Sequence, residues 1–199
     1  MMIQSKEDYK YYLEADKIAL GEKRERPHLI SIWESDVIWK FQRLLRKAEY
    51  LHNCKSSGLY KIYYKWIQYR LFRAQIKTGI NIPMNVFGPG LSIAHIGPIV
   101  INGFAKVGNN CRIHPFTTIG IDGRSGKVAT VGNDVYLSNG CKLIGDIEIG
   151  DGVVVAAGAV VTKSFLERNS VVGGVPAKVI SYTGNPFPQE RRGADIAKR

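Results

Sequence analysis

The feature that most constrains this chain is a period of six residues that runs from about residue 87 to residue 172. Read from Val107, the blocks are VGNNCR, IHPFTT and IGIDGR. Read from Val131, they are VGNDVY, LSNGCK, LIGDIE, IGDGVV, VAAGAV and VTKSFL. Each block opens on an aliphatic residue. The fifth place is mostly small or β-branched, at Cys111, Thr117, Val135, Cys141, Ile147, Val153 and Ala159.

A period of six fits neither a helix face, which repeats every 3.6 residues, nor a lone strand, which repeats every two. It fits a chain that turns a corner every six residues, so that three blocks close one triangular coil and the opening aliphatics stack inside. Short strands in a sandwich would give no reason for so strict a period. We therefore predict a mainly β fold with a solenoid over residues 80–183.

Residues 1–79 are predicted to form an α-helical segment. Apolar residues recur at helical spacing over residues 4–20, from Ser31 or Ser35 to about Cys54, and from Gly58 to about Gly79. We expect these helices to pack on the first coils, whose open end needs a cover. Residues 184–199 are a polar tail, which we expect to be disordered at its end.

The positive charge is concentrated in the helical segment. The chain carries a formal charge of +11, and residues 1–79 hold sixteen Lys and Arg against nine Asp and Glu. A basic surface can serve nucleic acid, an anionic membrane or an acidic ligand. No nucleic-acid-binding motif accompanies the charge, so we expect no nucleic-acid partner. Residues 58–78 could lie on a membrane surface, but we favour their packing on the solenoid.

Several classes of protein do not fit the sequence. No apolar run is long enough to span a membrane, and the first residues lack the apolar core of a signal peptide. We expect a cytoplasmic protein. The three cysteines give no disulfide framework, and no Cys or His cluster has the spacing of metal ligands.

Residues 83–183 resemble the catalytic domain of the serine acetyltransferases. The resemblance is carried by the two-residue insertion before Val107, the stretch AHIGPIVINGFAKVG and the ending GGVPAKVI. It implies the left-handed parallel β-helix of hexapeptide-repeat acyltransferases and O-acetyl transfer from acetyl-CoA as co-substrate. It also implies a homotrimer, and it leaves open whether two trimers pair through their helical segments.

His95 occupies the third place of the block that begins at Ile93, a position that faces outward. The resemblance implies that His95 is the general base that takes the proton of the acceptor hydroxyl, a task that suits the pKa of imidazole. The family has an acid directly before this histidine, where this chain has Ala94, and a second acid about fifteen residues earlier. An ungapped match places Ile80 at the second position and a one-residue gap places Asn81, whose amide could accept a hydrogen bond, so we predict that Asn81 orients the ring.

Three further residues are predicted to bind the acceptor. His114 lies at a corner in the block IHPFTT. Asp122 and Arg124 lie in the stretch GIDGRSGKVAT at 120–130, which is glycine-rich and charged, so we expect it to leave the solenoid as a loop. His28 and His52 are interpreted as surface residues of the helical segment.

The resemblance also places CoA in a groove between neighbouring subunits, towards the C-terminal coils. The matching small or polar positions are Ser138, Asn139, Gly140, Ala157 and Gly158. Lys163 and Lys178 are predicted to meet the phosphates of CoA.

Three alternatives remain open. The acceptor can be L-serine or a sugar hydroxyl of a cell-surface polysaccharide precursor, since the missing acids weaken the case for an amino acid. The chain can instead be a non-catalytic scaffold that associates with a membrane surface through its basic aromatic helix. A metal-dependent hydratase, as in carbonic-anhydrase-like relatives, would need three converging histidines, and His95 and His114 supply two.

Overall fold

The computed structural model describes residues 2–55 and 58–197. Its first three helices are α1 (Lys6–Leu20), α2 (Glu34–Cys54) and α3 (Leu59–Thr78). The Ser5 hydroxyl accepts the N–H of Asp8 at 2.9 Å and so caps the start of α1. Gly21, at a φ of 72°, ends the same helix in the left-handed conformation that glycine adopts without strain. The three stretches predicted to be helical are confirmed.

Fourteen short strands follow within the described residues. They are β1 (Ile80–Asn81), β2 (Ser92–Ile93), β3 (Ile99–Ile101), β4 (Lys106–Val107), β5 (Arg112–Ile113), β6 (Thr118–Gly120), β7 (Thr130–Val131), β8 (Tyr136–Leu137), β9 (Lys142–Ile144), β10 (Glu148–Ile149), β11 (Val154–Val155), β12 (Val160–Val161), β13 (Val171–Gly174) and β14 (Ala177–Ser181).

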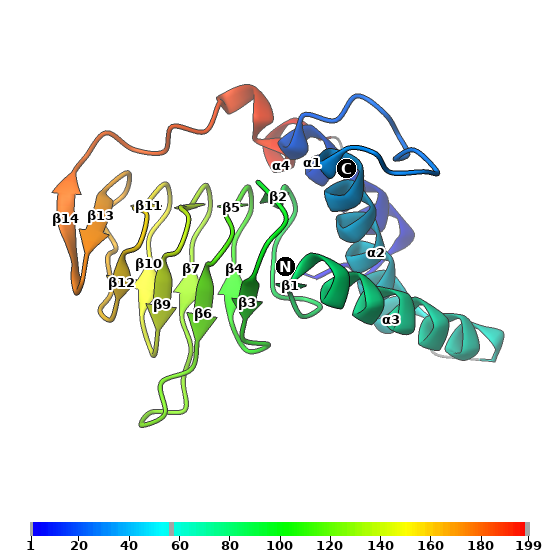
Figure 1. Ribbon diagram of the computed structural model, residues 1–199, viewed down its shortest axis with the longest axis horizontal. Coiled ribbons are helices and arrows are strands. Elements are labelled where there is room, and N and C mark those ends of the chain that lie inside the picture. Colours follow the sequence, from blue (N-terminus) through cyan, green and yellow to red (C-terminus); the bar gives the residue numbers. More distant parts are fainter. Residues whose placement is uncertain (1, 56–57, 198–199) are drawn as a thin grey trace.

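The strands build three sheets around one axis. The first sheet has the order β1-β3-β6-β9-β12, the second β4-β7-β10 and the third β2-β5-β8-β11-β13-β14. Neighbouring strands are parallel, except that β13 and β14 form an antiparallel pair. The chain visits the third, first and second sheets in turn, so each circuit is one coil with three corners. Figure 1 shows these coils stacked from the helices at one end to β14 at the other. The architecture is a parallel β-helix preceded by helices.

The strand register explains the period of six. Leu137 pairs with Val155, so a regular coil takes 18 residues, or three blocks. The first coils are longer because they hold the two-residue insertion before Val107 and the loop between β6 and β7. The opening aliphatic residues from Ile93 to Val161 are buried, and so are the small or β-branched residues at the fifth place. The predicted apolar core is confirmed.

Two corners of the β-helix matter for the site. We call the edge where the chain passes from the third sheet to the first the His95 corner, because His95 lies there between β2 and β3. We call the edge where the chain passes from the first sheet to the second the loop corner, because the predicted loop leaves the coil there between β6 and β7. Figure 1 shows this loop projecting away from the stack.

A buried ionic cluster joins the helices to the first coil. Arg46 of α2 donates to Asp16 of α1 at 2.8 Å and to Glu49 at 3.0 Å, and all three side chains are buried. The guanidinium also donates to the backbone oxygens of Phe87 and Gly88, and Asp16 accepts the N–H groups of Gly90 and Leu91. A buried charge is costly unless it is paired and hydrogen-bonded, and this cluster satisfies both needs at the junction.

The C-terminal tail returns to the helical segment. It runs back along the coils and ends in a short 3-10 helix η1 (Gln189–Arg191) and in α4 (Gly193–Ile196), which packs on α1. Figure 1 shows this path above the strands. The hydroxyl of Tyr11 donates to the backbone oxygen of Ala194 at 2.7 Å, and Gly193 and Ala194 are buried. The tail is therefore ordered further than its polarity suggests, while residues 198–199 lie outside the described residues.

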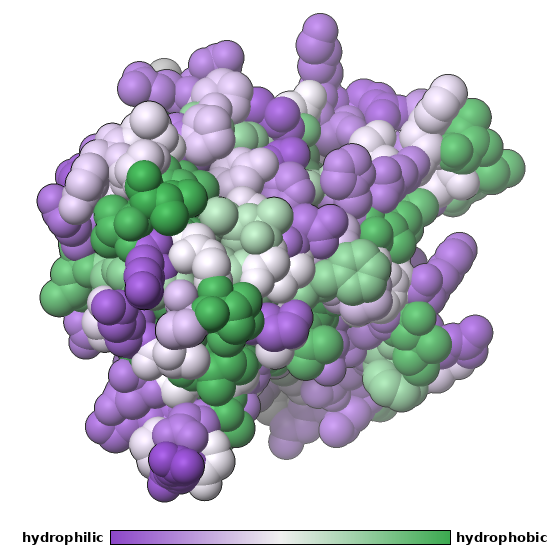
Figure 2. All heavy atoms as spheres, turned by 60° about the vertical axis from the view of Figure 1, so that its left-hand side comes forward, coloured by the Kyte–Doolittle hydropathy of each residue, from purple (hydrophilic) through white to green (hydrophobic). Residues whose placement is uncertain are grey.

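None of the helices in the described residues combines the length and the apolar character that crossing a membrane requires. The far end of the β-helix leaves Leu166, Val175 and Ile180 exposed. Figure 2 brings this end forward and shows hydrophobic clusters separated by hydrophilic surface.

Candidate active site

His95 lies against the start of α2. Its Nδ1 is 3.1 Å from Oε2 of Glu34, and Oε1 of Glu34 accepts the N–H of Ile96 at 2.6 Å. The Ile96 N–H, together with the His95 ring, holds the pKa of Glu34 below its usual range. Glu34 is therefore ionised at neutral pH and can only accept hydrogen bonds, so Nδ1 of His95 carries the proton and donates it. The other ring nitrogen, Nε2, is then the basic one.

Asn81, which was predicted to orient His95, lies elsewhere. It is exposed at the end of β1 in the first sheet, where its backbone pairs with Val100. The side chain that the structure places against the ring is Glu34. The sequence does not indicate Glu34, because the helix that supplies it begins 61 residues before His95 and no repeat or motif links the two positions.

His114 lies one coil further along the same corner. The centroids of the His95 and His114 rings are 6.4 Å apart, and the Tyr136 ring is 5.0 Å from that of His114. Burial, followed by the charges of Arg112 and His95, lowers the pKa of His114 to about 4. Its buried Nε2 has no hydrogen-bond partner among the described residues. His114 is thus a neutral imidazole with one ring nitrogen unused beside the candidate base.

The residues predicted to bind CoA continue this line. The backbone oxygen of Pro115 accepts the N–H of Gly140 at 3.0 Å, and that of Asn139 accepts the N–H of Gly158 at 2.9 Å. Ser138–Gly140 and Ala157–Gly158 therefore stack on the His95 corner in successive coils, about 4.8 Å apart. A Cβ on Gly158 would meet nothing within 4 Å. The corner offers a strip of backbone and small side chains that begins at His95.

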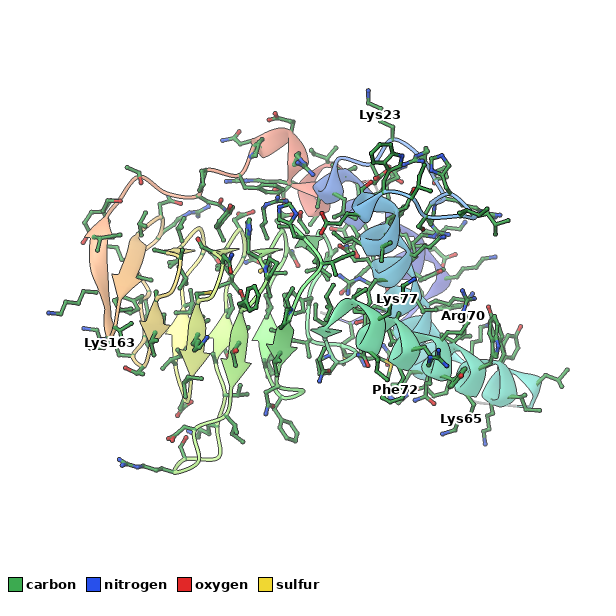
Figure 3. The ribbon with its side chains drawn as sticks, in the orientation of Figure 1. Lys23, Lys65, Arg70, Phe72, Lys77 and Lys163 are labelled. Atoms are coloured by element: carbon green, nitrogen blue, oxygen red, sulfur yellow. The ribbon has the colours of Figure 1, made fainter. Side chains whose placement is uncertain are left out.

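The two predicted phosphate-binding lysines lie in different places. Lys178 of β14 pairs with Gly173 of β13, next to the C-terminal end of the His95 corner. Lys163 follows β12 on the loop corner, with its Nζ 5.4 Å from the centroid of the Phe165 ring. Figure 3 shows Lys163 at the end of the coils that is remote from the helices.

Asp122 and Arg124 also lie on the loop corner. The Asp122 carboxylate accepts the N–H groups of Arg124 and Ser125, both at 3.1 Å, and these bonds hold its pKa below the usual range. Asp122 thus shapes the loop, while Arg124 is exposed. Within one chain, the structure brings His95, His114 and the strip of small residues together but leaves Asp122, Arg124 and Lys163 at the next corner.

The titratable side chains next to the His95 ring are the Glu34 carboxylate and the His114 imidazole. No group of three or more His, Cys, Asp or Glu side chains within residues 2–55 and 58–197 is placed to hold a metal ion. Cys111 and Cys141 are buried in the coils, and burial raises the pKa of the Cys141 thiol to about 11. His95 is exposed over 62% of its side chain and Glu34 over 45%, so the ring is open to a small molecule.

Comparison with known proteins concerns the repeat, the fold and the family of this chain. A family model described as bacterial transferase hexapeptide (six repeats) matches residues 129–163. The serine acetyltransferase of Synechococcus elongatus is 37% identical over 114 residues, which cover 56% of this chain and 46% of that protein. That of Mycobacterium tuberculosis is 37% identical over 120 residues, or 57% and 52%. This chain thus spans about half the length of these two relatives.

Two further similarities extend over more of the chain. The serine acetyltransferase of Bacillus licheniformis is 30% identical over 156 residues, which cover 70% of this chain and 72% of that protein. A solved structure of a Brucella abortus serine acetyltransferase in complex with coenzyme A superposes with a TM-score of 0.64 at 25% identity. That match covers 90% of this chain and 68% of the other.

Proposed function

Because this chain belongs to the serine acetyltransferase family, we propose that it transfers an acetyl group from acetyl-CoA to the hydroxyl of a small acceptor, with His95 as general base. The observation that carries this proposal is the hydrogen bond between His95 and Glu34 at the start of the strip of small residues. This hydrogen bond uses Nδ1 and leaves Nε2 of His95 free to accept a proton, at the end of the corner where the thioester would lie.

The chemistry follows from this geometry. Nε2 of His95 takes the proton of the acceptor hydroxyl while the hydroxyl oxygen forms a bond to the thioester carbonyl carbon. The tetrahedral intermediate then collapses and the carbon–sulfur bond breaks. The leaving CoA thiolate takes the proton from His95, which returns the ring to its neutral form. Glu34 stabilises the imidazolium that exists between these two transfers. His114, whose ring centroid lies 6.4 Å from that of His95, would line the acceptor site beside the base.

The donor would lie along the His95 corner. Ser138, Asn139 and Gly140, followed by Ala157 and Gly158, would let the pantetheine arm run against backbone. Lys178, at the C-terminal end of the corner, would meet the phosphates. We also propose that the β-helix is left-handed, as the resemblance to hexapeptide-repeat acyltransferases implies.

A trimer would complete the site. The His95 corner and the loop corner flank the same first sheet, but they face different directions, so one chain cannot join them. A cyclic arrangement would set the His95 corner of one chain against the loop corner of its neighbour. Asp122, Arg124 and Lys163 of the neighbour would then face the groove. The cytoplasmic location that the sequence predicts stays a prediction.

We propose L-serine as the first acceptor to test, because the three similar proteins named above are serine acetyltransferases. A sugar hydroxyl is the second candidate. It is favoured by Ala94, which stands where the family has an acid, and by the Asp122 carboxylate, whose oxygens are already used within the loop.

The test incubates the protein with acetyl-CoA and a panel of acceptors and measures turnover as the release of free CoA thiol. L-serine and a set of nucleotide sugars would be compared, and the mass of the purified protein would be measured in solution. We expect a trimer that releases CoA faster with at least one acceptor than without any. A release rate that no acceptor raises would reject the proposed function.

A further inference from the structure

A cavity lies in the helical segment, away from the candidate active site. It has a volume of about 910 Å³ and lies between α2, α3 and the residues just before α2. We call it the helical cavity. Its lining contains seven Lys and Arg side chains and, among the described residues, no Asp or Glu. Arg26 is one of the seven, and the helices supply the other six: Lys40, Arg43, Lys47, Arg70, Arg73 and Lys77.

The spacing of these cations is the same on both helices. On α2 they lie at positions 40, 43 and 47, and on α3 at positions 70, 73 and 77. Residues three, four and seven apart lie on one face of a helix, so each helix presents one row of cations, and both rows line one cavity. Figure 3 shows Arg70 and Lys77 on one side of α3, and Lys65 and Phe72 on the other.

In residues 2–55 and 58–197, the cations of the helical cavity have no carboxylate partner. Where they have hydrogen-bond partners, these are neutral: Lys40 donates to the backbone oxygen of Leu29, Arg43 to that of Glu25, and Arg73 to the Tyr69 hydroxyl. Within the described part of the chain, no carboxylate pairs with any of the seven. Burial lowers the pKa of Lys47, and the charge of Arg43 lowers it further. Clustered like charges destabilise the folded chain unless an anion joins them.

We propose that the helical cavity binds a ligand that carries a diphosphate or two closely spaced phosphate groups. Guanidinium groups match phosphate with paired hydrogen bonds, and ammonium groups add charge. Tyr9, Tyr63 and Ile67 add apolar surface for the rest of the ligand, and the volume is in the range of small-molecule sites.

This inference goes beyond the proposed function and does not depend on it. The phosphates of CoA are assigned to Lys178 of β14, whereas α2 and α3, which line the helical cavity, lie at the opposite end of the molecule (Figure 1). The phosphates could come from a free diphosphate ester or from the headgroup of an anionic lipid, because the cavity opens to the surface beside the exposed residues Leu29 and Tyr69.

Calorimetric titration of the full chain with inorganic pyrophosphate and with UDP tests the free source. The test variant is the double substitution Arg73→Gln/Lys77→Gln in the lining, and the matched control is Lys61→Gln/Lys65→Gln, which removes equal charge from the same helix outside the cavity. We expect the first pair to weaken binding about tenfold or more and the second less than about twofold.

Two further variants guard the interpretation. Lys47→Gln, on the opposite wall, should also weaken binding, which keeps the test valid if the first pair disturbs α3. Lys178→Gln should leave pyrophosphate binding unchanged, because it alters only the proposed CoA site. A loss with Lys178→Gln equal to that of the cavity pair would place the anion at the other end of the molecule and overturn the proposal.

Flotation with phosphatidylcholine vesicles, with and without cardiolipin, whose headgroup carries two phosphates, tests the lipid source. Binding that needs cardiolipin and is lost only in Arg73→Gln/Lys77→Gln assigns a headgroup to the cavity. Pyrophosphate binding without vesicle binding assigns a free ligand. Equal losses in the cavity pair and the control pair would show attraction to the whole basic surface of α3, and this outcome, like a wild-type chain that binds neither probe, contradicts the proposal.

Discussion

At the scale of single residues, one carboxylate decides how His95 can act. Glu34 accepts from both the Ile96 N–H and Nδ1 of the ring, which fixes the ring orientation and the position of its proton. The same charge would lie beside the imidazolium that forms during transfer. Because Glu34 is almost half exposed, water screens part of this attraction, and its effect on the rate should be moderate.

The substitution Glu34→Gln tests this positioning role. Gln keeps the size and one oxygen acceptor but loses the charge, so we expect kcat to fall about tenfold through weaker stabilisation of the imidazolium. The KM for acetyl-CoA should not change, because the donor strip lies further along the corner. Steady-state kinetics would check both, with Glu7→Gln, an exposed residue in α1, as control. A kcat equal to that of the wild type would show that Glu34 does not assist His95.

His114 should make stability depend on pH. In the folded chain its pKa is about 4, whereas an unfolded histidine titrates near 6.5. Between these values the unfolded chain binds more protons at this histidine than the folded chain does. The contribution of His114 to stability is therefore fully present above pH ~6.5 and is lost as the pH falls towards 4. In His114→Gln this contribution is absent. The drop in urea midpoint between pH 7 and pH 5 should be smaller than in the wild type or in the exposed control His52→Gln, and equal drops would contradict the burial of a neutral ring.

At this scale the sequence was informative where a residue takes part in the repeat. The outward position of His95 and the small residues along its corner follow from the period of six. Glu34 does not, because a hydrogen bond between a helix start and a coil corner depends on how the two elements dock. Nothing in the local sequence of either element encodes that docking.

At the scale of elements, the helices are attached to the coils by a polar junction. Besides the cluster around Arg46, the Gln42 amide of α2 donates to the backbone oxygen of Leu91 and its oxygen accepts the N–H of Ile93. These bonds occupy backbone groups that an uncovered first coil would expose as a free edge. The sequence predicted the cover but not its polar chemistry, since Asp16, Gln42, Arg46 and Glu49 look like surface residues in their own helices.

Replacing Arg46 by Met should destabilise the chain by roughly 3–5 kcal/mol, because Asp16 and Glu49 would stay buried without their cation. Denaturant unfolding would measure the change, with the exposed Arg168→Met as control. A loss below about 1 kcal/mol, the range of surface ion pairs, would mean that the cluster is solvated in solution.

The docked tail makes a second prediction. A Cβ on Gly193 would lie 1.8 Å from the backbone oxygen of Ala15, so α4 packs on α1 only with glycine at this position. Gly193→Ala should release the tail and speed tryptic cleavage at Arg191 and Arg192. Gly123→Ala, in the open loop where a Cβ meets nothing within 4 Å, serves as control. Unchanged cleavage of Gly193→Ala would show that the tail is not held there.

At the scale of the whole molecule, the β-helix separates groups of different chemistry along its axis. His95, the proposed base, lies next to the helices, the strip of small residues proposed for the donor extends along one corner, and seven Lys and Arg side chains line the helical cavity. The period of six and the helical spacing predicted this order of parts. They could not predict which parts touch, because the tail, the junction and the loop corner are placed by contacts between residues far apart in the chain.

The central claim is that His95 acts as the base while the corner beyond it holds the donor. The most direct measurement compares His95→Asn with the exposed control His52→Asn, using acetyl transfer to the best acceptor and, separately, CoA affinity by calorimetry. The account predicts a loss of about 100-fold or more in kcat for His95→Asn, with CoA affinity and the control unchanged. A His95→Asn chain that turns over within about twofold of the wild type would contradict it.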